Sequence, residues 1–436
     1  MKNTPNKTAT PSVEFDTAKL IDLQKQYVDD ATKLWQQAWG NVASPSSANV
    51  PVSDRRFAAD AWKNNPVAAL TASAFLMNAR ALQGMADAVQ TDDKTKARIR
   101  YAVEQFNAAA SPSNYLMTNA EALQKAIDTQ GESLNQGMKN LLTDVKQGHI
   151  SMTDESQFEV GKNVATTEGA VVFENELFQL IEYKPLTKQV YERPFLLVPP
   201  CINKFYILDL NPKKSFVRWA TEQGLTVFVV SWVNADEKQG RKSFSDYMRE
   251  GFLEAVQAVQ DATGAEKINT IGYCIGGTMV AAALGYMAAK NDHRVNAATF
   301  FTTQVDFEKA GDLRVYVDEE QVKWIEQRME EKGYLAGSRM ADAFNLLRSN
   351  DLIWSYVINN YMLGKEPMPF DLLYWNSDST RMPAAMHSFY LRNMYLGNLL
   401  QEPGGITLGG VKIDISKVKT PCYFISTIED HIAPWK

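Results

Sequence analysis

A glycine-rich stretch at residues 272–278, Gly-Tyr-Cys-Ile-Gly-Gly-Thr, constrains the fold of this chain more than any other. The residues before it, 267–271, are rich in β-branched side chains, which is typical of a buried strand. The residues after it, 279–284, are small and apolar, which is typical of a helix packed on a sheet. Strand, sharp glycine turn and helix give the pattern Gly-x-nucleophile-x-Gly its chemical meaning. The stretch therefore predicts a nucleophile elbow with Cys274 at its tip.

Cys274 also has a structural interpretation, because most free cysteines are small buried hydrophobic residues. A Gly-x-Cys-x-Gly pattern is short enough to arise by chance. The predicted strand and helix on either side favour the catalytic interpretation, in which the turn holds the nucleophile above the edge of the sheet.

Composition bounds the class of protein. A chain of 436 residues can bury a large core and is long enough for two domains, and its net charge of -6 gives no indication of nucleic-acid binding. The three cysteines, Cys201, Cys274 and Cys422, are widely spaced, which suits a reducing cytoplasm and not a disulfide framework or a zinc ribbon. The first residues show no secretion signal, and the longest apolar run, around 279–289, is too short for a transmembrane segment.

The second half of the chain alternates between predicted strands and helices. Continuous apolar runs typical of buried strands lie at 195–198, 226–230, 298–301 and 422–426, and a β-hairpin is predicted over 170–183. Helices are predicted at 211–223 and 243–262. This alternation predicts a doubly wound α/β sheet, and with the elbow it predicts an α/β-hydrolase fold.

Three regions are predicted along the chain. Residues 1–50 form an N-terminal segment that is disordered up to about residue 12 and then an amphipathic helix, followed by a Ser/Pro/Asn linker at 44–53. Residues 51–165 form a helical domain, and residues 166–436 form the α/β catalytic domain. The long helix at 68–89 has the candidate core positions Leu70, Phe75, Leu76, Leu82, Met85 and Val89.

Residues 312–401 separate the last two predicted strands and are far too numerous for a loop. They are rich in methionine and in aromatic residues, including Trp324, Trp354, Tyr390 and Tyr395. We expect a helical lid above Cys274. Any one of these aromatics could belong to the core of the lid, but as a group they predict an apolar site that excludes water.

A cysteine nucleophile needs a base, because the free thiol has a pKa of about 8.5 and only the thiolate attacks. The base is normally a histidine oriented by a carboxylate, in the chain order nucleophile, acid, histidine. Asp430 follows the last predicted strand and is the first candidate for the acid. Asp306, after the preceding strand, is the second. The structural alternative for Asp430 is an aspartate that caps a loop.

The histidine is harder to assign. The sequence contains His149, His293, His387 and His431. His431 adjoins Asp430, and neighbouring residues cannot easily bond to each other and also reach Cys274. The expected histidine would follow one more helix and strand, but the sequence stops at Lys436. We therefore expect a C-terminally truncated enzyme that lacks its base.

The oxyanion hole of such an elbow is made by backbone N–H groups. The first donor is expected to be Ile275, directly after the nucleophile. The second is expected in the loop after Val198, near Cys201. Trp375 and His431 are candidates for the substrate pocket, and no metal ligands are predicted.

Several longer motifs are more specific than the elbow: they lie at 55–62, 153–171, 198–204, 370–376 and 429–435. With the elbow, they make the chain resemble the class I polyhydroxyalkanoate synthases, the poly(3-hydroxybutyrate) polymerases, from about Arg55 to Trp435. The resemblance implies that Cys274 is the acylated nucleophile and Asp430 the acid of the triad. It places the family's histidine beyond Lys436, and His431 matches the histidine that the family carries beside its acid.

The activity that the resemblance implies is polymerisation of (R)-3-hydroxyacyl-CoA, with 3-hydroxybutyryl-CoA as the expected substrate, into polyester with release of CoA. The acyl group would be held on the cysteine as a thioester, and a dry pocket would keep water from hydrolysing it. No metal or redox cofactor is required. The phosphates of CoA need basic residues, and Lys204, Arg348 and Arg392 are not distinguished as candidates.

The resemblance also implies a homodimer at the surface of cytoplasmic polyester granules, with phasin-type partner proteins. The N-terminal amphipathic helix is a candidate for contact with the granule or a partner. Two alternatives stay open: another cysteine-dependent α/β-hydrolase, such as a thioesterase or lactone hydrolase, or an inactive fragment that only binds granules.

Overall fold

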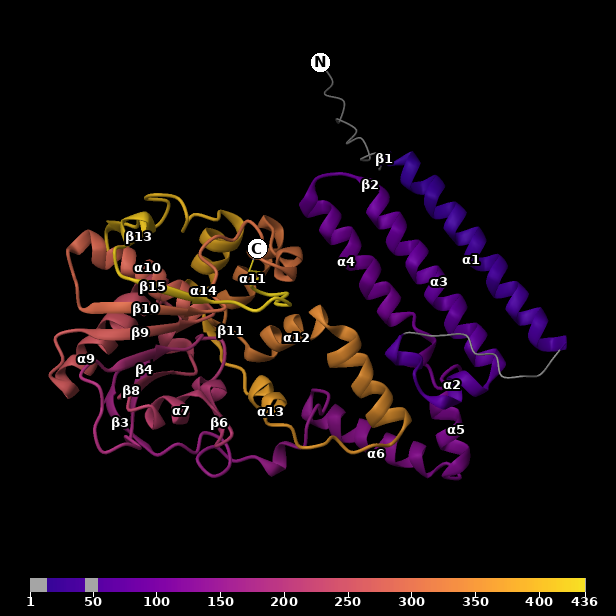
Figure 1. The fold of residues 1–436 in the computed structure, drawn as a ribbon, viewed down its shortest axis with the longest axis horizontal. Coiled ribbons are helices and arrows are strands. Elements are labelled where there is room, and N and C mark those ends of the chain that lie inside the picture. The colour runs from indigo at the N-terminus through magenta and orange to yellow at the C-terminus, as the bar shows by residue number, and fades with distance from the viewer. Residues whose placement is uncertain (1–13, 44–53, 436) are drawn as a thin grey trace, which may run out of the picture. The chain divides into compact units, whose positions relative to one another are not determined.

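The computed structural model describes residues 14–43 and 54–435 (Figure 1). The predicted disordered start up to residue 12, the predicted linker at 44–53 and Lys436 lie outside the described residues. Packing divides the chain into two compact units, one comprising Met1–Met152 with Arg348–Pro367 and the other Thr153–Leu347 with Met368–Lys436. No helix within the described ranges combines the length and the apolar character needed to span a membrane.

The first unit is built almost entirely from helices. Its main elements are α1 (Thr17–Ala43), α2 (Asp60–Asn64), α3 (Pro66–Ala88), α4 (Asp93–Ala109), α5 (Ala120–Asp128) and α6 (Glu132–Gln147), with β1 (Glu14–Phe15) paired to β2 (Val89–Gln90). The short helical turns are η1 (Arg55–Phe57), η2 (Pro112–Asn114), η8 (Asn350–Trp354) and η9 (Val357–Met362).

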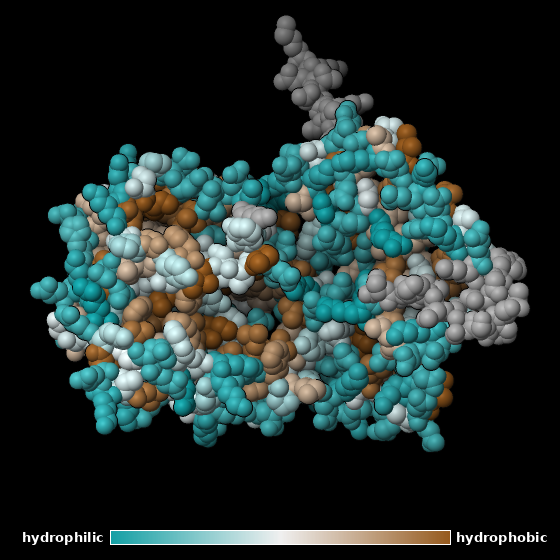
Figure 2. Space-filling view, viewed as in Figure 1, coloured by the Kyte–Doolittle hydropathy of each residue, from teal (hydrophilic) through white to brown (hydrophobic). Residues whose placement is uncertain are grey.

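The core positions predicted on the helix at 68–89 are confirmed in part, because Val89 is buried and Phe75 and Leu76 pack against a buried cluster. Leu70 and Met85 are exposed, whereas the buried positions of the helix are occupied by alanines such as Ala72 and Ala86. Small residues let α3 lie close to its neighbours α1 and α4, and Gly84 faces the side chain of Leu23 on α1. The larger side chains therefore remain at the rim or outside, and apolar residues appear among the mostly hydrophilic surface of this unit (Figure 2).

Residues 348–367 were predicted to belong to the lid, but they pack within the helical unit. Gly137 on α6 is a close-contact position, because a Cβ there would lie 2.0 Å from the carbonyl oxygen of Tyr361. The Asn140 side chain donates to the carbonyl of Asn360 at 3.0 Å, and the Tyr361 hydroxyl donates to Asp144 at 2.6 Å. Gly137 thus permits the close approach of this segment to α6, and Asn140 and Asp144 of the same helix bond to it.

The second unit contains a seven-stranded mixed sheet with the order β15-β10-β9-β5-β8-β4-β3. The strands are β3 (Gly169–Glu174), β4 (Phe178–Tyr183), β5 (Phe195–Val198), β8 (Val227–Trp232), β9 (Ile268–Tyr273), β10 (Val295–Phe301) and β15 (Cys422–Ile425). The hairpin β3–β4 is antiparallel and β4 runs antiparallel to β8, whereas β8, β5, β9, β10 and β15 are mutually parallel. The predicted strands and the predicted α/β fold are confirmed.

Helices cover both faces of this sheet, as the alternation of side chains along its strands requires. On β5, Leu196 packs in the cluster with α9 (Glu254–Thr263) and α10 (Ile275–Lys290), and Leu197 packs in the opposite cluster with α7 (Phe216–Glu222). The predicted helix at 243–262 is confirmed as α8 (Phe244–Asp246), η6 (Tyr247–Leu253) and α9 in succession.

The predicted helix at 211–223 begins later than expected. The pair β6 (Asp209–Asn211) and β7 (Lys214–Ser215) takes its first residues, and α7 starts at Phe216. The Ser215 hydroxyl accepts a hydrogen bond from the Arg218 N–H at 2.8 Å, which caps the helix. The cap at Ser215 therefore determines where the helix starts, and the apolar pattern of the sequence does not reveal this position.

The lid segments that remain in the second unit follow β10. They are η7 (Asp312–Tyr316), α11 (Glu319–Glu330), α12 (Gly337–Leu347), α13 (Asp371–Ser377), α14 (Ala384–Tyr390) and η10 (Leu391–Leu396). Two short antiparallel pairs also belong to this unit: β11 (Tyr334–Leu335) with β12 (Met382–Pro383), and β13 (Thr407–Leu408) with β14 (Val411–Lys412). Its minor helical turns are η3 (Glu155–Gln157), η4 (Phe205–Leu208), η5 (Glu237–Gln239) and η11 (Ile415–Lys417).

Candidate active site

The elbow is formed by the end of β9, Cys274 and the start of α10. Cys274 has φ 54° and ψ -123°, a conformation that a non-glycine residue adopts at a cost of about 1–3 kcal/mol. Its N–H donates to the carbonyl of Phe301 on β10 at 2.9 Å, and its own carbonyl accepts from the N–H groups of Gly277 and Thr278. The surrounding backbone thus fixes the strained residue at the carboxyl edge of the sheet.

Two glycines make the tight turn possible. A Cβ on Gly272 would lie 2.4 Å from the Cα of Gly277, and a Cβ on Gly276 would lie 2.2 Å from the carbonyl oxygen of Val198. Both contacts are with backbone atoms, which cannot rotate away. The close approach of strand and helix that the sequence predicts is therefore present.

The Cys274 thiol is half-buried and protonated at neutral pH. Burial raises the pKa of Cys274 to about 11, the hydrogen bond from the Ile275 N–H acts against this rise, and the Asp430 carboxylate adds to it. The N–H of Ile275 is thus directed at the sulfur, as expected of a donor at an oxyanion hole. As the first residue of α10, Ile275 also has no intrahelical partner for its N–H.

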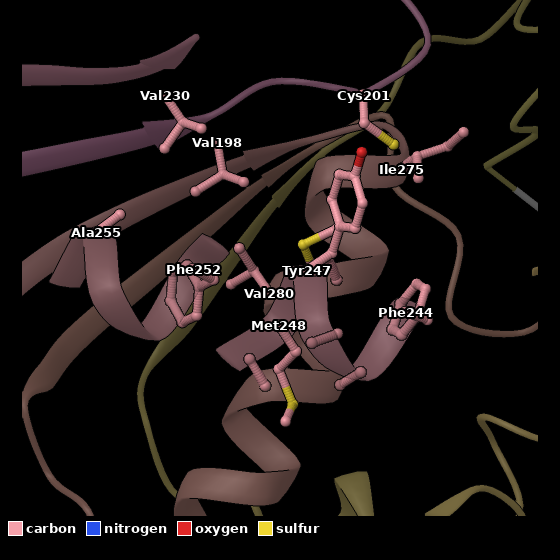
Figure 3. Packing of buried hydrophobic residues seen from close by; sticks show 14 of the residues in the cluster. Val198, Cys201, Val230, Phe244, Tyr247, Met248, Phe252, Ala255, Ile275 and Val280 are labelled. Carbon is pink, nitrogen blue, oxygen red and sulfur yellow. The ribbon is translucent and has the colours of Figure 1, made fainter. Parts of the chain in front are cut away.

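Cys201 lies in the turn after β5, beside the elbow. Figure 3 shows its sulfur directed toward Ile275, with the Tyr247 hydroxyl close to it. Burial raises the pKa of the Cys201 thiol to about 12, and the charge of Cys274 contributes to the rise. The turn that was predicted to supply the second N–H donor therefore lies next to Cys274.

Asp430 follows β15 and lies close enough to Cys274 for its charge to affect that thiol. Its Oδ1 accepts hydrogen bonds from the N–H groups of Ile432 and Ala433, at 2.9 and 2.8 Å, so it also caps its own turn. The second candidate, Asp306, accepts from Glu308 N–H and from the Asn398 amide. Asp430 is the carboxylate that combines a turn-capping role with proximity to the nucleophile.

His149, His293 and His387 make no hydrogen bond to the Cys274 sulfur within the described residues. His293 contacts the Asn291 side chain and lines a separate cavity at the amino ends of the strands, and His149 lies in the helical unit. The His431 carbonyl accepts from Asp312 N–H at 2.9 Å, and its ring lines neither of the cavities at the elbow. His387 is buried in α14 and lines the larger of these cavities.

Two adjoining cavities open at the elbow. A small pocket of about 30 Å³ is lined by Cys274, Ile275, Thr278, Thr302, Gln304, Ile432, Ala433 and residues shared with the next cavity. A larger cavity of about 400 Å³ is walled mainly by apolar side chains of α11, α12, α14 and η10. The residues that line both are Ile202, Ile275, Leu313, Phe344, Tyr390 and Tyr395.

An apolar site lined by aromatic residues is therefore present, but only some of the aromatic residues named from the sequence line it. Trp324, Tyr390 and Tyr395 line the cavities, whereas Trp354 packs in the helical unit. Trp375 lines neither cavity: its indole N–H donates to the Lys204 carbonyl at 2.8 Å, and it packs against a different cluster that includes Tyr206. Tyr390 was named from the sequence only as one of the lid aromatics, and its hydroxyl bonds to Thr278 at the start of α10.

The basic residues considered for CoA phosphates are differently engaged. Arg392 is held by Glu326 and Glu319, with nitrogen–oxygen distances of 2.7 and 3.1 Å, and Lys204 lies 3.8 Å from Asp378. Arg348 belongs to the helical unit. No group of three or more metal-ligating side chains gathers within residues 14–43 and 54–435.

Comparison with known proteins gives consistent matches. The sequence model described as the N-terminus of poly-beta-hydroxybutyrate polymerase (PhaC) matches residues 53–220, and that of the alpha/beta hydrolase fold matches 196–436. The poly(3-hydroxyalkanoate) polymerase subunit PhaC of Cupriavidus necator is 46% identical, over 99% of this chain and 74% of its own length. The poly(3-hydroxyalkanoate) polymerase of Methylorubrum extorquens is 48% identical, over 96% of this chain and 70% of its own length.

Among solved structures, a monoacylglycerol lipase from Paleococcus ferrophilus is similar with a TM-score of 0.34 and 13% identity, covering 60% of this chain and 80% of that one. The α/β-hydrolase assignment rests on the sequence model for that fold and on the strand order described above.

Proposed function

This chain belongs to the poly(3-hydroxyalkanoate) polymerase family, and from this premise we propose that it is an acyltransferase that polymerises (R)-3-hydroxyacyl-CoA, releasing CoA. The observation that carries the proposal is identity of 46% over 99% of the chain with a curated polymerase. The expected substrate is 3-hydroxybutyryl-CoA. The product is a polyester of 3-hydroxyacyl units.

The first step is transfer of the acyl group to Cys274. The sulfur attacks the thioester carbonyl of the substrate, a new carbon–sulfur bond forms, and CoA leaves as its thiol. The Ile275 N–H supports the negative charge that develops on the carbonyl oxygen, with a second donor proposed from the turn at Cys201. Exchange of one thioester for another keeps the acyl group activated for the next step.

The proton on Cys274 must leave as the acyl group arrives. Because burial holds the pKa of this thiol near 11, a base has to take the proton at neutral pH. We assign Asp430 the role of the carboxylate that orients a histidine base, which its proximity to the nucleophile supports.

In the second step a hydroxyl group attacks the acyl thioester, forming an ester and returning the sulfur to its thiol form. Water competes with that hydroxyl, and hydrolysis would end the chain. The mainly apolar lining of the larger cavity beside Cys274 supports selective attack by the hydroxyl, because it offers little polar surface that can hold water.

We also place the enzyme at the surface of cytoplasmic polyester granules, as a homodimer with phasin-type partners. Helix α1 supplies a surface suited to such contact, because Ile21, Val28 and Trp35 are exposed at seven-residue spacing. Deletion of residues 1–50 should release the protein from granules, and unchanged granule association would disprove this role of the segment.

The test of the proposed function is CoA release from (R)-3-hydroxybutyryl-CoA, followed by analysis of the product. The unaltered chain and a version extended by a C-terminal segment that supplies a histidine are each compared with Cys274→Ala and with Cys422→Ala, which removes an exposed cysteine on β15. We expect CoA release in the extended version, with polymer as product, that is lost in Cys274→Ala but not in Cys422→Ala. Free hydroxyacid in place of polymer would identify a hydrolase, and equal activity in Cys274→Ala would exclude this cysteine as the nucleophile.

A further inference from the structure

The cavity of about 400 Å³ in the lid is large enough for more than a single acyl group, since small-molecule sites begin at roughly 300 Å³. Its walls come from α11, α12, α14 and η10, all in the α/β unit. It shares six lining residues with the small pocket at Cys274. An acyl chain attached to the cysteine can therefore extend into it.

Two buried polar atoms interrupt the apolar wall. His387 is 5% exposed, and its Nδ1 has no hydrogen-bond partner among the described residues. The Oε1 of Gln321 is also buried without a partner within the same part of the chain. An unsatisfied buried polar atom costs about 1–3 kcal/mol, so two in one apolar cavity require an explanation.

Neighbouring charged groups do not explain them. Arg328 stacks over the Trp324 ring, 4.0 Å from its centre, and Arg339 lies 3.9 Å from the exposed carboxylate of Asp342. Both arginines and Asp342 line the cavity, and each has a partner other than His387 or Gln321. His387 and Gln321 are left as hydrogen-bonding groups with no partner of their own in the wall.

The polar atoms are also uncharged, which limits the ligand. Burial lowers the pKa of His387 to about 4, so its ring is neutral at neutral pH and offers one donor and one acceptor. Gln321 Oε1 accepts only. Arg328, Arg339 and Asp342 also line the cavity, but the two polar atoms that lack partners are neutral, and they suit an ester with a hydroxyl group.

We propose that this cavity binds the hydroxyl-terminated end of a short oligo(3-hydroxyacyl) ester, with Gln321 accepting a hydrogen bond from the terminal hydroxyl and His387 donating to an ester carbonyl. The proposal rests on the proposed function, since an oligomer joined to Cys274 by its carboxyl end directs its hydroxyl end away from the sulfur. Gln321 and His387 are positioning residues. They retain the first few units of the chain while it is still short enough to be lost by hydrolysis.

The experiment measures binding to the full chain with Cys274→Ala, so that no turnover is needed. The probe is the methyl ester of the (R)-3-hydroxybutyrate trimer, and the comparison probes are the same trimer with its hydroxyl acetylated and free CoA. Fluorescence of Trp324, which lines the cavity, reports binding, and a Trp324→Phe variant identifies the part of the signal that comes from this residue.

The expected result is saturable binding of the trimer, with the acetylated trimer bound more weakly. His387→Leu should weaken trimer binding by about tenfold, the loss of one hydrogen bond. Gln321→Met should abolish the preference for the free hydroxyl. The matched control, Gln257→Met on the exposed face of α9, should change neither.

The stability of the variants separates a ligand site from a structural role. Replacing an unsatisfied buried polar group by an apolar one of similar shape should leave the melting temperature unchanged or raise it. A structural role predicts the opposite, a lower melting temperature with unchanged trimer binding. If His387→Leu does not fold, the structural role is favoured for that residue and Gln321→Met alone decides the site.

Equal binding of both trimers, displacement of the trimer by CoA, or unchanged binding in both cavity variants would overturn the proposal. Failure of the proposed function would appear separately, as absence of Cys274-dependent CoA release in the version extended by a histidine-bearing C-terminal segment. A chain that releases CoA but does not distinguish the trimers would retain the polymerase assignment and lose this site.

Discussion

The elbow and the lid meet at the same nucleophile but are built in opposite ways. At the elbow, backbone atoms fill the space around Gly272 and Gly276 so closely that a single added carbon has no room. In the lid, helices α11, α12 and α14 enclose about 400 Å³, and two of the lining residues, Gln321 and His387, each have a buried polar atom without a hydrogen-bond partner among the described residues.

The difference reflects two tasks: the elbow holds the nucleophile, and the lid accommodates the growing product. A strained nucleophile must be held in one conformation, and close packing achieves that. A growing product changes length with every cycle, so its site needs space and side chains that can pair with more than one group. The elbow is expected to tolerate almost no change of volume, whereas the lid is expected to tolerate changes and to respond through binding.

The largest expected effect comes from filling the elbow. Gly276→Ala should lower the free energy of unfolding of the α/β unit by about 3 kcal/mol, the upper part of the range for overpacking, because its Cβ would overlap the Val198 carbonyl. Gly285→Ala is the matched control in the same helix. Its Cβ would meet one methyl group of Ile413, and the better helix propensity of alanine offsets this by about 1 kcal/mol. Urea unfolding of the two variants measures the difference, and equal losses would refute the special tightness of the elbow.

The next prediction concerns the ionisation of the nucleophile. With a pKa raised from 9.0 to about 11, the fraction of Cys274 present as thiolate at neutral pH is about a hundredfold below that of an unshifted cysteine. Alkylation of Cys274 by iodoacetamide should therefore be slow at neutral pH and rise about tenfold per pH unit up to that pKa. The control is the same residue in the urea-unfolded chain, which should react faster. A rate that is already independent of pH at neutrality would show that a base in this chain ionises the thiol.

The sequence predicted the elbow well, because its determinants are local. Gly272 and Gly276 flank Cys274 in the chain itself, and the β-branched run that precedes them specifies the strand. The strands of the sheet were predicted for the same reason. The start of α7 was not, because the cap at Ser215 and the short β6–β7 pair outweighed the apolar pattern.

For the lid, the sequence predicted an apolar, aromatic-rich surface but not which residues form it. Aromatic residues between 312 and 401 indicated an apolar site, but nothing local distinguishes Tyr390, which reaches Thr278, from Trp375, which packs elsewhere. Likewise, nothing in the sequence indicates that His387 Nδ1 is buried without a hydrogen-bond partner among the described residues, because that depends on helices distant in the chain. Residues 348–367 pack in the helical unit and not in the lid, because they contact Gly137 and Asn140. The hydrophobic periodicity of the sequence does not reveal such contacts.

A smaller loss of stability is expected from a change at the contact between the lid and the elbow. The Tyr390 hydroxyl bonds to Thr278, whose own hydroxyl donates to the Gln304 carbonyl at 2.8 Å. Tyr390→Phe should lower the free energy of unfolding by about 1 kcal/mol, the net value of one hydrogen bond. Tyr423→Phe on β15 is the control, because that side chain is exposed. Equal stability of the two variants would mean that this bond does not couple the lid to α10.

The smallest effect is expected at the outer surface of the lid, where Arg392 bonds to Glu326 and Glu319. The hydrogen bond from Arg392 holds the pKa of Glu326 below its ordinary value, so the pair stabilises the fold above that ordinary value and the contribution is lost as pH falls through the lowered pKa. Arg392→Gln should therefore destabilise the chain less than Tyr390→Phe at neutral pH, and not measurably in acid once the pH has fallen through the lowered pKa of Glu326. Added salt should reduce the neutral-pH difference, because the groups are partly exposed. Unfolding of both proteins at the two pH values measures it, and a loss that persists in acid would show that Arg392 acts by packing and not by charge.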